Sequence, residues 1–243
     1  MENGYKEKFY SKYISTHNLN LYGERDFNYL KSQFPSWQKY FSVFLPENKE
    51  AKIIDLGCGE GALINWLQDL GFKNAEGIDV SSEQIELGRK FGIKNLKEAN
   101  ILEFIRDKGN LYDLIFLRDV LGHFDKEGVL LVLDSVFKSL RAGGVLIVKT
   151  PNAESPLSGR LRYGDFTHDV SFTGSSLKQV LMVCGFKNIR IYPMRPVVHG
   201  LISFIRYVLW FCIEFKIKLY RLIEAGGSAG FYTQNIFAAA EKK

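Results

Sequence analysis

Alternating glycines and two aspartates form the most informative chemical pattern in this 243-residue chain. Gly57, Gly59 and Gly61 follow directly after an apolar run that ends in Asp55. Glycine permits positive φ and leaves room for a ligand beside the backbone, and the helix after such a loop points its N-terminus at that ligand. A second apolar run ends at Asp79, whose carboxylate can accept hydrogen bonds from both hydroxyls of a ribose. The pattern therefore predicts a cofactor site.

The spacing of the glycines indicates which cofactor. A dinucleotide loop has the spacing G-x-G-x-x-G, whereas Asp55-Leu56-Gly57-Cys58-Gly59-Glu60-Gly61 has D-x-G-x-G-x-G. This stretch resembles the first motif of the class I S-adenosylmethionine (SAM) methyltransferases. The resemblance implies SAM as cofactor and an α/β fold: a Rossmann-like, seven-stranded, mostly parallel sheet with helices on both faces and an antiparallel last strand. It implies cofactor contacts from Asp55, Gly57, Cys58, Gly59, Gly61, Asp79, Val80, Asn100, Ile101, Arg118, Arg25 and Tyr22.

Two histidines are the candidate bases. Transfer of a methyl group to a hydroxyl requires removal of the acceptor proton, and histidine titrates near neutral pH. His168 lies in a polar loop after the expected fifth strand, so we expect it to act as base with Asp165 or Asp169 orienting its ring. His123, after the fourth strand, is the second candidate, and a purely structural role for either histidine is the alternative. Two carboxylates and one imidazole at the spacing of Asp165, His168 and Asp169 are not a recognised metal site, so we expect no metal.

These residues need a sheet to position them. From Lys52 onward, short apolar runs alternate with helical periodicity, which indicates parallel βαβ units. Ser81 and Gln84 have the spacing of a capping box, and Asp125 and Thr173 stand where further helices begin. The expected strands are about 52–56, 75–79, 96–99, 112–117, 145–149, 187–192 and 233–240. The expected divisions are a helical cap (1–50), a core that includes a substrate loop at 151–172 (51–193), an apolar helical insertion (194–232) and a last strand with a tail (233–243).

The insertion combines apolar and charged residues. Residues 197–223 are rich in aliphatic and aromatic side chains, but Arg206, Glu214, Lys216 and Lys218 leave no uncharged window long enough to span a membrane. We expect a long helix that packs on the core or on a second copy of the chain. The alternative is an interfacial helix that makes a peripheral membrane contact.

Composition excludes several other classes of protein. Hydrophobic residues make up 46% of the chain, enough for a sizeable core, and the net charge of +5 is scattered, so no nucleic-acid partner is expected. Cys58, Cys184 and Cys212 lie far apart, without disulfide or zinc spacing. The N-terminus is polar and has no secretory apolar run. We expect a cytoplasmic location, with membrane association as the alternative.

The acceptor is the least specified part of the prediction. Residues 163–169 and 196–200 resemble bacterial methyltransferases that act in surface-polysaccharide assembly, which implies a small-molecule or glycan hydroxyl as acceptor. Two alternatives stay open: a lipid or quinone methyltransferase at a membrane surface, and a SAM-binding regulatory subunit without turnover.

Overall fold

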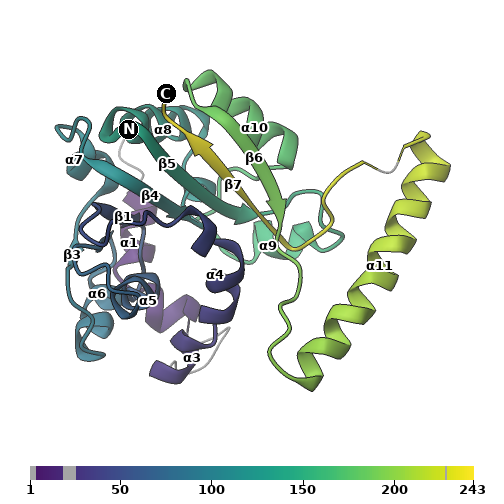
Figure 1. Cartoon of the computed structure of the whole chain (residues 1–243), viewed down its shortest axis with the longest axis horizontal. Helices are drawn as coiled ribbons and strands as arrows, with labels where there is room; N and C mark the ends of the chain where they lie inside the picture. Colours follow the sequence, from purple (N-terminus) through teal and green to yellow (C-terminus); the bar gives the residue numbers. More distant parts are fainter. Residues whose placement is uncertain (1–3, 19–25, 228) are drawn as a thin grey trace.

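A seven-stranded sheet organises the described part of the chain, which in this computed structural model comprises residues 4–18, 26–227 and 229–243. The strand order is β3-β2-β1-β4-β5-β7-β6, and β7 runs antiparallel to both of its neighbours (Figure 1). This order confirms the predicted Rossmann-like sheet. The strands are β1 (Ile53–Leu56), β2 (Glu76–Asp79), β3 (Leu96–Glu98), β4 (Tyr112–Arg118), β5 (Leu140–Pro151), β6 (Lys187–Pro193) and β7 (Asn235–Glu241).

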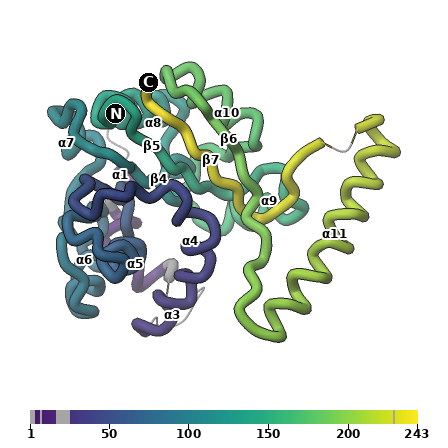
Figure 2. The backbone as a smooth tube through the Cα atoms, in the orientation of Figure 1, coloured from purple at the N-terminus to yellow at the C-terminus, as the bar shows by residue number. Residues whose placement is uncertain are grey.

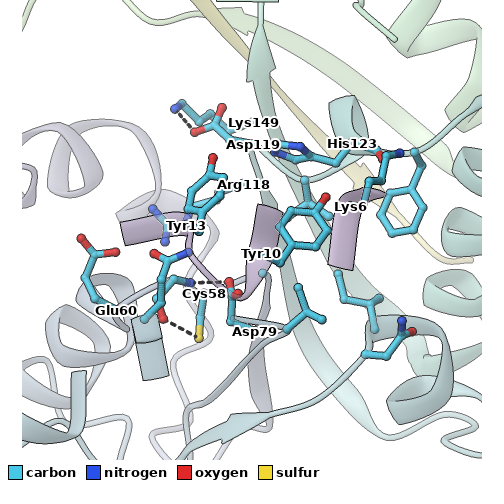
Figure 3. A pocket seen from close by; sticks show the side chains of 18 of the residues that line it. Lys6, Tyr10, Tyr13, Cys58, Glu60, Asp79, Arg118, Asp119, His123 and Lys149 are labelled. Atoms are coloured by element: carbon cyan, nitrogen blue, oxygen red, sulfur yellow. Dashed lines mark hydrogen bonds and ion pairs between the residues drawn. The ribbon is translucent and has the colours of Figure 1, made fainter. Parts of the chain in front are cut away.

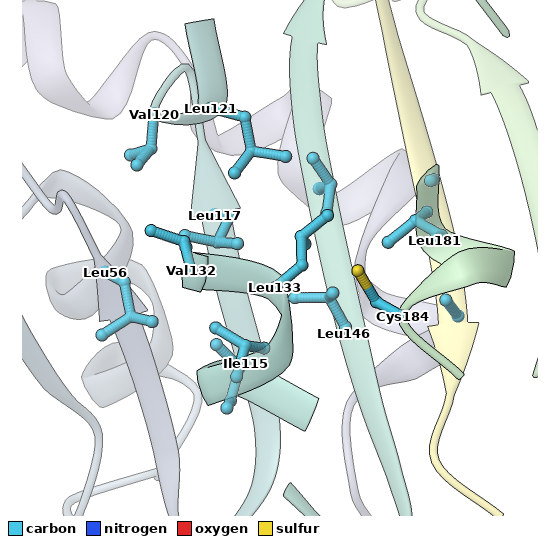
Figure 4. Close-up of a cluster of buried hydrophobic side chains, with 14 of the residues drawn as sticks. Leu56, Ile115, Leu117, Val120, Leu121, Val132, Leu133, Leu146, Leu181 and Cys184 are labelled. Carbon is cyan, nitrogen blue, oxygen red and sulfur yellow. The ribbon is translucent and has the colours of Figure 1, made fainter. Parts of the chain in front are cut away.

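Both faces of the sheet are covered because its central strands are apolar on both sides. In β4, Ile115 and Leu117 face one buried cluster while Leu114 and Phe116 face the other, as the two-residue period of a strand requires. Helices α8 (Lys126–Ser139) and α10 (Gly174–Val183) cover the first face (Figure 4). Helices α4 (Phe34–Tyr40), α5 (Ala62–Asp69) and α6 (Ser82–Lys90) supply the second cluster.

Local sequence signals determine where most of these helices begin. The Asp125 side chain accepts a hydrogen bond of 2.7 Å from the Gly128 N–H at the start of α8, and Thr173 forms a capping box with Ser176 at the start of α10. The prediction of a capping box at Ser81 was wrong. Its hydroxyl has no partner within the described residues, its N–H donates to Asp79, and the Gln84 side chain lies against the glycine loop.

The N-terminal residues form a cap made of several short helices. They are α1 (Gly4–Tyr10), a π-helical turn η1 (Ile14–Asn18), α3 (Phe27–Lys31), α4 and η2 (Ser42–Phe44). The Ile14 N–H donates to Glu83 of α6 at 2.9 Å, and Tyr13 and Lys6 bond to residues of the 151–172 segment. The cap therefore connects α6 with the 151–172 segment across the edge of the sheet at which β1, β2 and β4 end. Two short turns lie at the same edge, α7 (Ile101–Ile105) and η3 (Leu121–His123).

The 151–172 segment contains a helix that the sequence analysis did not predict. Residues 151–172 were expected to be without regular structure, but α9 spans Ser158–Tyr163. No residue of α9 is buried, so the apolar periodicity that reveals a packed helix is absent there. The Arg162 side chain instead fixes this helix by donating to the backbone carbonyls of His168 and Asp169.

The insertion is a single long helix. Helix α11 spans Leu201–Ala225 and ends at Gly226, whose φ of 67° is left-handed. Helix α11 lies to one side of the sheet (Figures 1 and 2), and Lys39 of α4 lies over its Tyr207 ring, with 5.6 Å between the Lys39 Nζ and the ring centroid. Within the ranges that the structure describes, no helix has both the length and the apolar run needed to cross a membrane.

Candidate active site

A cavity of about 960 Å³ opens where β1, β2 and β4 end, beneath the N-terminal cap (Figure 3). Its walls include the glycine loop, residues after β2 and β4, and Lys6, Tyr10 and Tyr13 from the cap. The predicted site residues that line it are Gly57, Cys58, Gly59, Asp79, Val80, Asn100, Ile101, Arg118 and His123. Asp55, Gly61, Asp165 and His168 are not among the lining residues, and Tyr22 and Arg25 lie outside the described residues.

The glycine loop forms one wall of the cavity, and at Gly57 the protein leaves no room for a side chain. The N–H groups of Gly57 and Cys58 both donate to the Ile78 carbonyl, at 2.8 and 2.9 Å, which fastens the loop to β2. Gly57 has φ of 80°, and a Cβ at this position would lie 2.2 Å from a methyl group of Val120. Glycine is therefore required at this position, and the close approach of a ligand to this backbone stays a prediction.

Asp79 lies on the next wall. One of its carboxylate oxygens accepts from the Gly59 N–H at 2.8 Å and the other from the Ser81 N–H at 2.9 Å. Burial raises the pKa of Asp79 to about 6, and these two hydrogen bonds oppose that shift. Each oxygen can accept one further hydrogen bond, so the carboxylate is suited to a pair of ribose hydroxyls.

Asp55 has a supporting role and does not line the cavity. It is fully buried and pairs with Arg118 Nη2 at 2.9 Å. The guanidinium also lies over the Trp37 ring, with its carbon 5.0 Å from the ring centroid. Burial raises the pKa of Asp55, and the positive charge of Arg118 opposes that shift. The acid of the D-x-G-x-G-x-G motif therefore holds Arg118 in the cavity wall.

The residues at the cavity fit SAM. Within the described part of the chain, Arg118 Nε and Asp119 Oδ1 are buried without a hydrogen-bond partner, although both residues line the cavity. A ligand with an amino-acid group can pair with such atoms. The predicted contact of Asn100 with adenine stays a prediction, since the Asn100 side chain caps α7 by accepting from the Leu102 N–H at 2.9 Å.

His123 belongs to a hydrogen-bonded network that enters from the 151–172 segment. Its Nδ1 lies 2.9 Å from the Thr167 hydroxyl, which in turn donates to Asp165 at 2.6 Å. Because the single hydroxyl proton of Thr167 goes to Asp165, Thr167 can only accept from His123. The network therefore places the ring proton of His123 on Nδ1 and leaves Nε2 as an acceptor.

Burial and neighbouring groups determine the charges in this network. Burial, and then the neighbouring His168, lower the pKa of His123 to about 4, so its ring is neutral at pH 7. Burial acts to raise the pKa of Asp165, but hydrogen bonds from Thr167 and from the Tyr13 hydroxyl, the latter at 2.6 Å, outweigh it and lower that pKa to about 2. Asp165 is therefore a carboxylate whenever His123 is a free base.

The expected orientation of His168 by Asp165 or Asp169 is not found. His168 Nδ1 lies 3.2 Å from the Leu161 carbonyl, whereas Asp165 bonds to Thr167 and Asp169 pairs with Lys6. The His168 ring lies behind that of His123, with 4.5 Å between the ring centroids. The predicted orientation of His168 by a carboxylate is therefore wrong, and its action as a base stays a prediction.

Three of these side chains are close enough together to be considered as metal ligands. Ligand atoms of His123, Asp165 and His168 all lie within 4.8 Å of one another. Both carboxylate oxygens of Asp165, however, already accept hydrogen bonds, from Thr167 and from Tyr13. The described contacts are those of a hydrogen-bond network, and the absence of a metal stays a prediction.

The sequence analysis did not identify four contributors to the site. Tyr10 and Tyr13 line the cavity, and the Tyr10 ring lies edge-on to His123 with 6.1 Å between centroids. Lys6 donates to the His123 carbonyl oxygen, and Thr167 links His123 to Asp165. The dense aromatic residues of the cap were the available signal, but their spacing does not show which of them turn toward the sheet edge.

Comparisons with known proteins agree with this geometry. Residues 29–191 match the family model of a methyltransferase domain. A phosphoethanolamine N-methyltransferase of Plasmodium falciparum (isolate 3D7) is 23% identical over 175 residues, 70% of this chain and 65% of that protein. An uncharacterized protein of Rickettsia prowazekii (strain Madrid E) is 32% identical over 117 residues, 45% of this chain and 46% of that protein. The chain thus spans about half to two thirds of the length of these relatives.

Solved structures extend the likeness to nearly the whole chain. A SAM-dependent methyltransferase from Archaeoglobus fulgidus superposes with a TM-score of 0.69 at 19% identity, covering 95% of this chain and all of that one. A phosphoethanolamine N-methyltransferase 2 of Haemonchus contortus, in complex with phosphomonomethylethanolamine and S-adenosylhomocysteine, gives a TM-score of 0.61 at 15% identity. It covers 99% of this chain and 58% of that one. The predicted fold and the predicted cofactor, SAM, are confirmed.

Proposed function

The chain belongs to the methyltransferase domain family, and we propose that it moves the methyl group of SAM to a hydroxyl group of a small-molecule or glycan acceptor. SAM, when bound, supplies an electrophilic methyl group. The observation that carries the proposal is His123, a neutral imidazole on the cavity wall whose Nε2 is free to take a proton. During the transfer to an acceptor, the hydroxyl proton would pass to His123 Nε2.

The network behind His123 suits this role. Asp165, charged and buried, holds Thr167, and Thr167 holds the His123 ring in the tautomer that presents Nε2. Asp165 also favours the imidazolium that forms on proton transfer. The nearby phenol of Tyr10 narrows the space next to the base. The residues thus position the ring and stabilise its charged form.

The charges of the cavity favour an uncharged acceptor over a phosphorylated one. The basic side chains among the described lining residues are Lys6, Arg118 and Lys149, and each is already paired with an aspartate, Asp169, Asp55 and Asp119 respectively. A phosphate group would need at least one cation free to pair with it. This arrangement supports a neutral hydroxyl group as acceptor. The proposed acceptor therefore differs from the phosphoethanolamine in the name of the Plasmodium relative.

An amine is the second candidate acceptor. Asp119 is one of the residues that line the cavity, and its buried Oδ1 has no hydrogen-bond partner among the described residues. A carboxylate there can hold an ammonium group before methylation. The amine candidate is favoured if turnover with amines exceeds turnover with hydroxyl compounds.

The test is turnover with labelled SAM against panels of hydroxyl compounds, glycan fractions, lipid extracts and amines. His123→Asn keeps a donor toward Thr167 and removes the base, so we expect kcat to fall about 10² to 10⁴-fold while the Kd for SAM is unchanged. His168→Asn is the matched control, with a much smaller effect on kcat.

The alternatives predict different results. Unchanged turnover of His123→Asn on a hydroxyl acceptor would contradict the assignment of the base. Tight SAM binding without turnover on any panel would favour a regulatory subunit over an enzyme. A strong preference for lipid extracts would favour the lipid or quinone methyltransferase.

A further inference from the structure

Helix α11 buries polar residues and exposes apolar ones, which is the reverse of a helix that packs on a hydrophobic core. Its two buried residues, Ser203 and Glu214, are both polar. Glu214 accepts from Arg195 Nε at 2.9 Å and Nη2 at 2.8 Å and pairs with Lys218 at 3.0 Å. Its apolar residues face outward. Thirteen large hydrophobic side chains between residues 201 and 223 are at least 45% exposed, among them Leu201, Ile202, Phe204, Phe215 and Ile223. A helix in water places these two faces the other way round.

The apolar face is too wide for a single partner helix. At 100° per residue, the exposed hydrophobic side chains of α11 cover an arc of roughly 200° along its whole length. A packed helix buries an arc of roughly 100°, and the seam between two paired helices is narrower still. A second copy of α11 would therefore leave much of this face in water, whereas a lipid bilayer surrounds every outward side.

The charges of α11 favour an anionic surface. Helix α11 has four basic residues and two acidic ones, and Glu214 is already paired with Arg195 and Lys218. Arg206 and Lys216 are exposed, and neither has a carboxylate within ion-pair distance in the part of the chain described. Arg206 lies at the edge of the apolar arc and Lys216 lies within it, and both have long side chains that can extend to anionic head groups.

From these observations we infer that α11 lies flat in the surface of an anionic lipid bilayer, with its apolar face at the acyl boundary and the sheet on the aqueous side. Its 25 residues extend about 37 Å, at 1.5 Å per residue, which gives a long line of contact. The inference does not depend on which acceptor the cavity takes.

Contacts at the C-terminal end of α11 connect it to the site. Arg221 lies 3.9 Å from Glu154, and the Asn152 side chain donates to the carbonyls of Phe231 and Thr233 at 2.6 and 2.9 Å. Both Asn152 and Glu154 belong to the 151–172 segment that carries Thr167 and Asp165. A membrane that binds α11 is therefore held beside the segment that positions His123.

Cys212 provides a direct test in the full chain. It is exposed on the outward side of α11, whereas Cys58 and Cys184 are buried, so an environment-sensitive thiol fluorophore labels it selectively. With vesicles of phosphatidylcholine and phosphatidylglycerol we expect a blue shift of its emission, smaller with phosphatidylcholine alone. The matched control carries the fluorophore at Val43→Cys in a Cys212→Ser chain, because Val43 is 77% exposed on η2, and it should show no shift.

Vesicle cosedimentation with paired variants gives the second measurement. Phe204→Glu with Phe215→Glu should weaken binding about a hundredfold or more, since each removes a large apolar side chain from lipid. Val43→Glu with Val183→Glu adds the same charge at exposed positions away from α11 and should leave binding unchanged. Arg206→Gln with Lys216→Gln should weaken binding to anionic vesicles by roughly fivefold per residue.

Light scattering tests whether a second copy of the chain covers the apolar face of α11 instead of lipid. A chain that forms a stable dimer, ignores vesicles and becomes monomeric with the two phenylalanine changes would assign the face to a second copy and overturn the inference. A monomer that ignores vesicles, with no shift at Cys212, would overturn it as well.

Discussion

Asp79 and His123 line the same cavity, and burial shifts their pKa values in opposite directions. Burial disfavours the charged form of each group, so it raises the carboxyl pKa to about 6 and lowers the imidazole pKa to about 4. At pH 7 the carboxylate is therefore charged and the imidazole neutral, which are the forms needed to bind ribose and to accept a proton. On acidification, Asp79 changes form first.

This order predicts the pH dependence of cofactor affinity. As pH falls through about 6, Asp79 takes up a proton and loses acceptor capacity, so the affinity for SAM should fall. Asp79→Asn should weaken SAM binding by about 1 to 3 kcal/mol and remove the pH dependence between pH 5 and 7. Calorimetry across this range measures both effects. Glu98→Gln, on the exposed end of β3, is the control and should retain the wild-type profile; a wild-type profile for Asp79→Asn would remove this carboxylate from the cofactor site.

At the scale of elements, the contact between α6 and the glycine loop leaves no space for an added methyl group. A Cβ on Gly88 would lie 2.4 Å from the Glu60 carbonyl oxygen, which is backbone and cannot swing away. Gly88→Ala should therefore lower the free energy of unfolding by about 1 to 3 kcal/mol, as overpacking does. Gly109→Ala, where nothing lies within 4 Å, should change it by less than about 0.5 kcal/mol. Urea unfolding of the two variants checks the difference, and equal midpoints would show that the helix can move.

The elements that the sequence could predict are those with a local signal. Strands β1, β2 and β4 are apolar runs with clear ends, and Asp125 and Thr173 begin helices by their own side chains. The helix α9 has no buried residue, and at Ser81 the N–H donates to Asp79 in place of a capping box with Gln84. Local spacing finds elements that stabilise themselves, and it misses those that depend on distant contacts.

The same distinction explains which parts of the candidate site could be predicted from the sequence. The cofactor wall comes from short continuous motifs, and most of it could be predicted. The hydrogen-bond network around His123 joins residues far apart in the chain: Thr167 bonds to His123, 44 positions away, and Tyr13 bonds to Asp165, 152 positions away. Proximity in sequence favoured Asp165 as the partner of His168, whereas the fold assigns it, through Thr167, to His123.

At the scale of the whole molecule, the attachment of α11 to the body depends on Glu214. Hydrogen bonds from Arg195 lower the pKa of Glu214 to about 2 in the folded state, below its ordinary value of 4.5. Between these values the unfolded chain binds more protons, so the stabilisation is complete above pH 4.5 and is lost as pH falls toward 2. Glu214→Gln should mimic this loss at neutral pH.

Limited proteolysis of the two connections of α11 measures the effect. We expect cleavage about tenfold faster in Glu214→Gln, because α11 detaches more often, and no change in Glu224→Gln, whose carboxylate accepts a hydrogen bond from Tyr220 within α11. Equal cleavage rates in the two variants would show that apolar contacts, and not this ion pair, hold α11 in place.

The position of β7 determines when the sheet can be completed during synthesis. β7 lies between β5 and β6, but it follows α11 in the chain, so β6 has no neighbour to pair with until α11 and the connection after it have been made. Until then, β5 and β6 are open edges to which other chains can add. A growing chain therefore presents the open edge of β5 and the unpaired strand β6 together with an apolar helix, and it stays vulnerable to aggregation until the residues of β7 leave the ribosome.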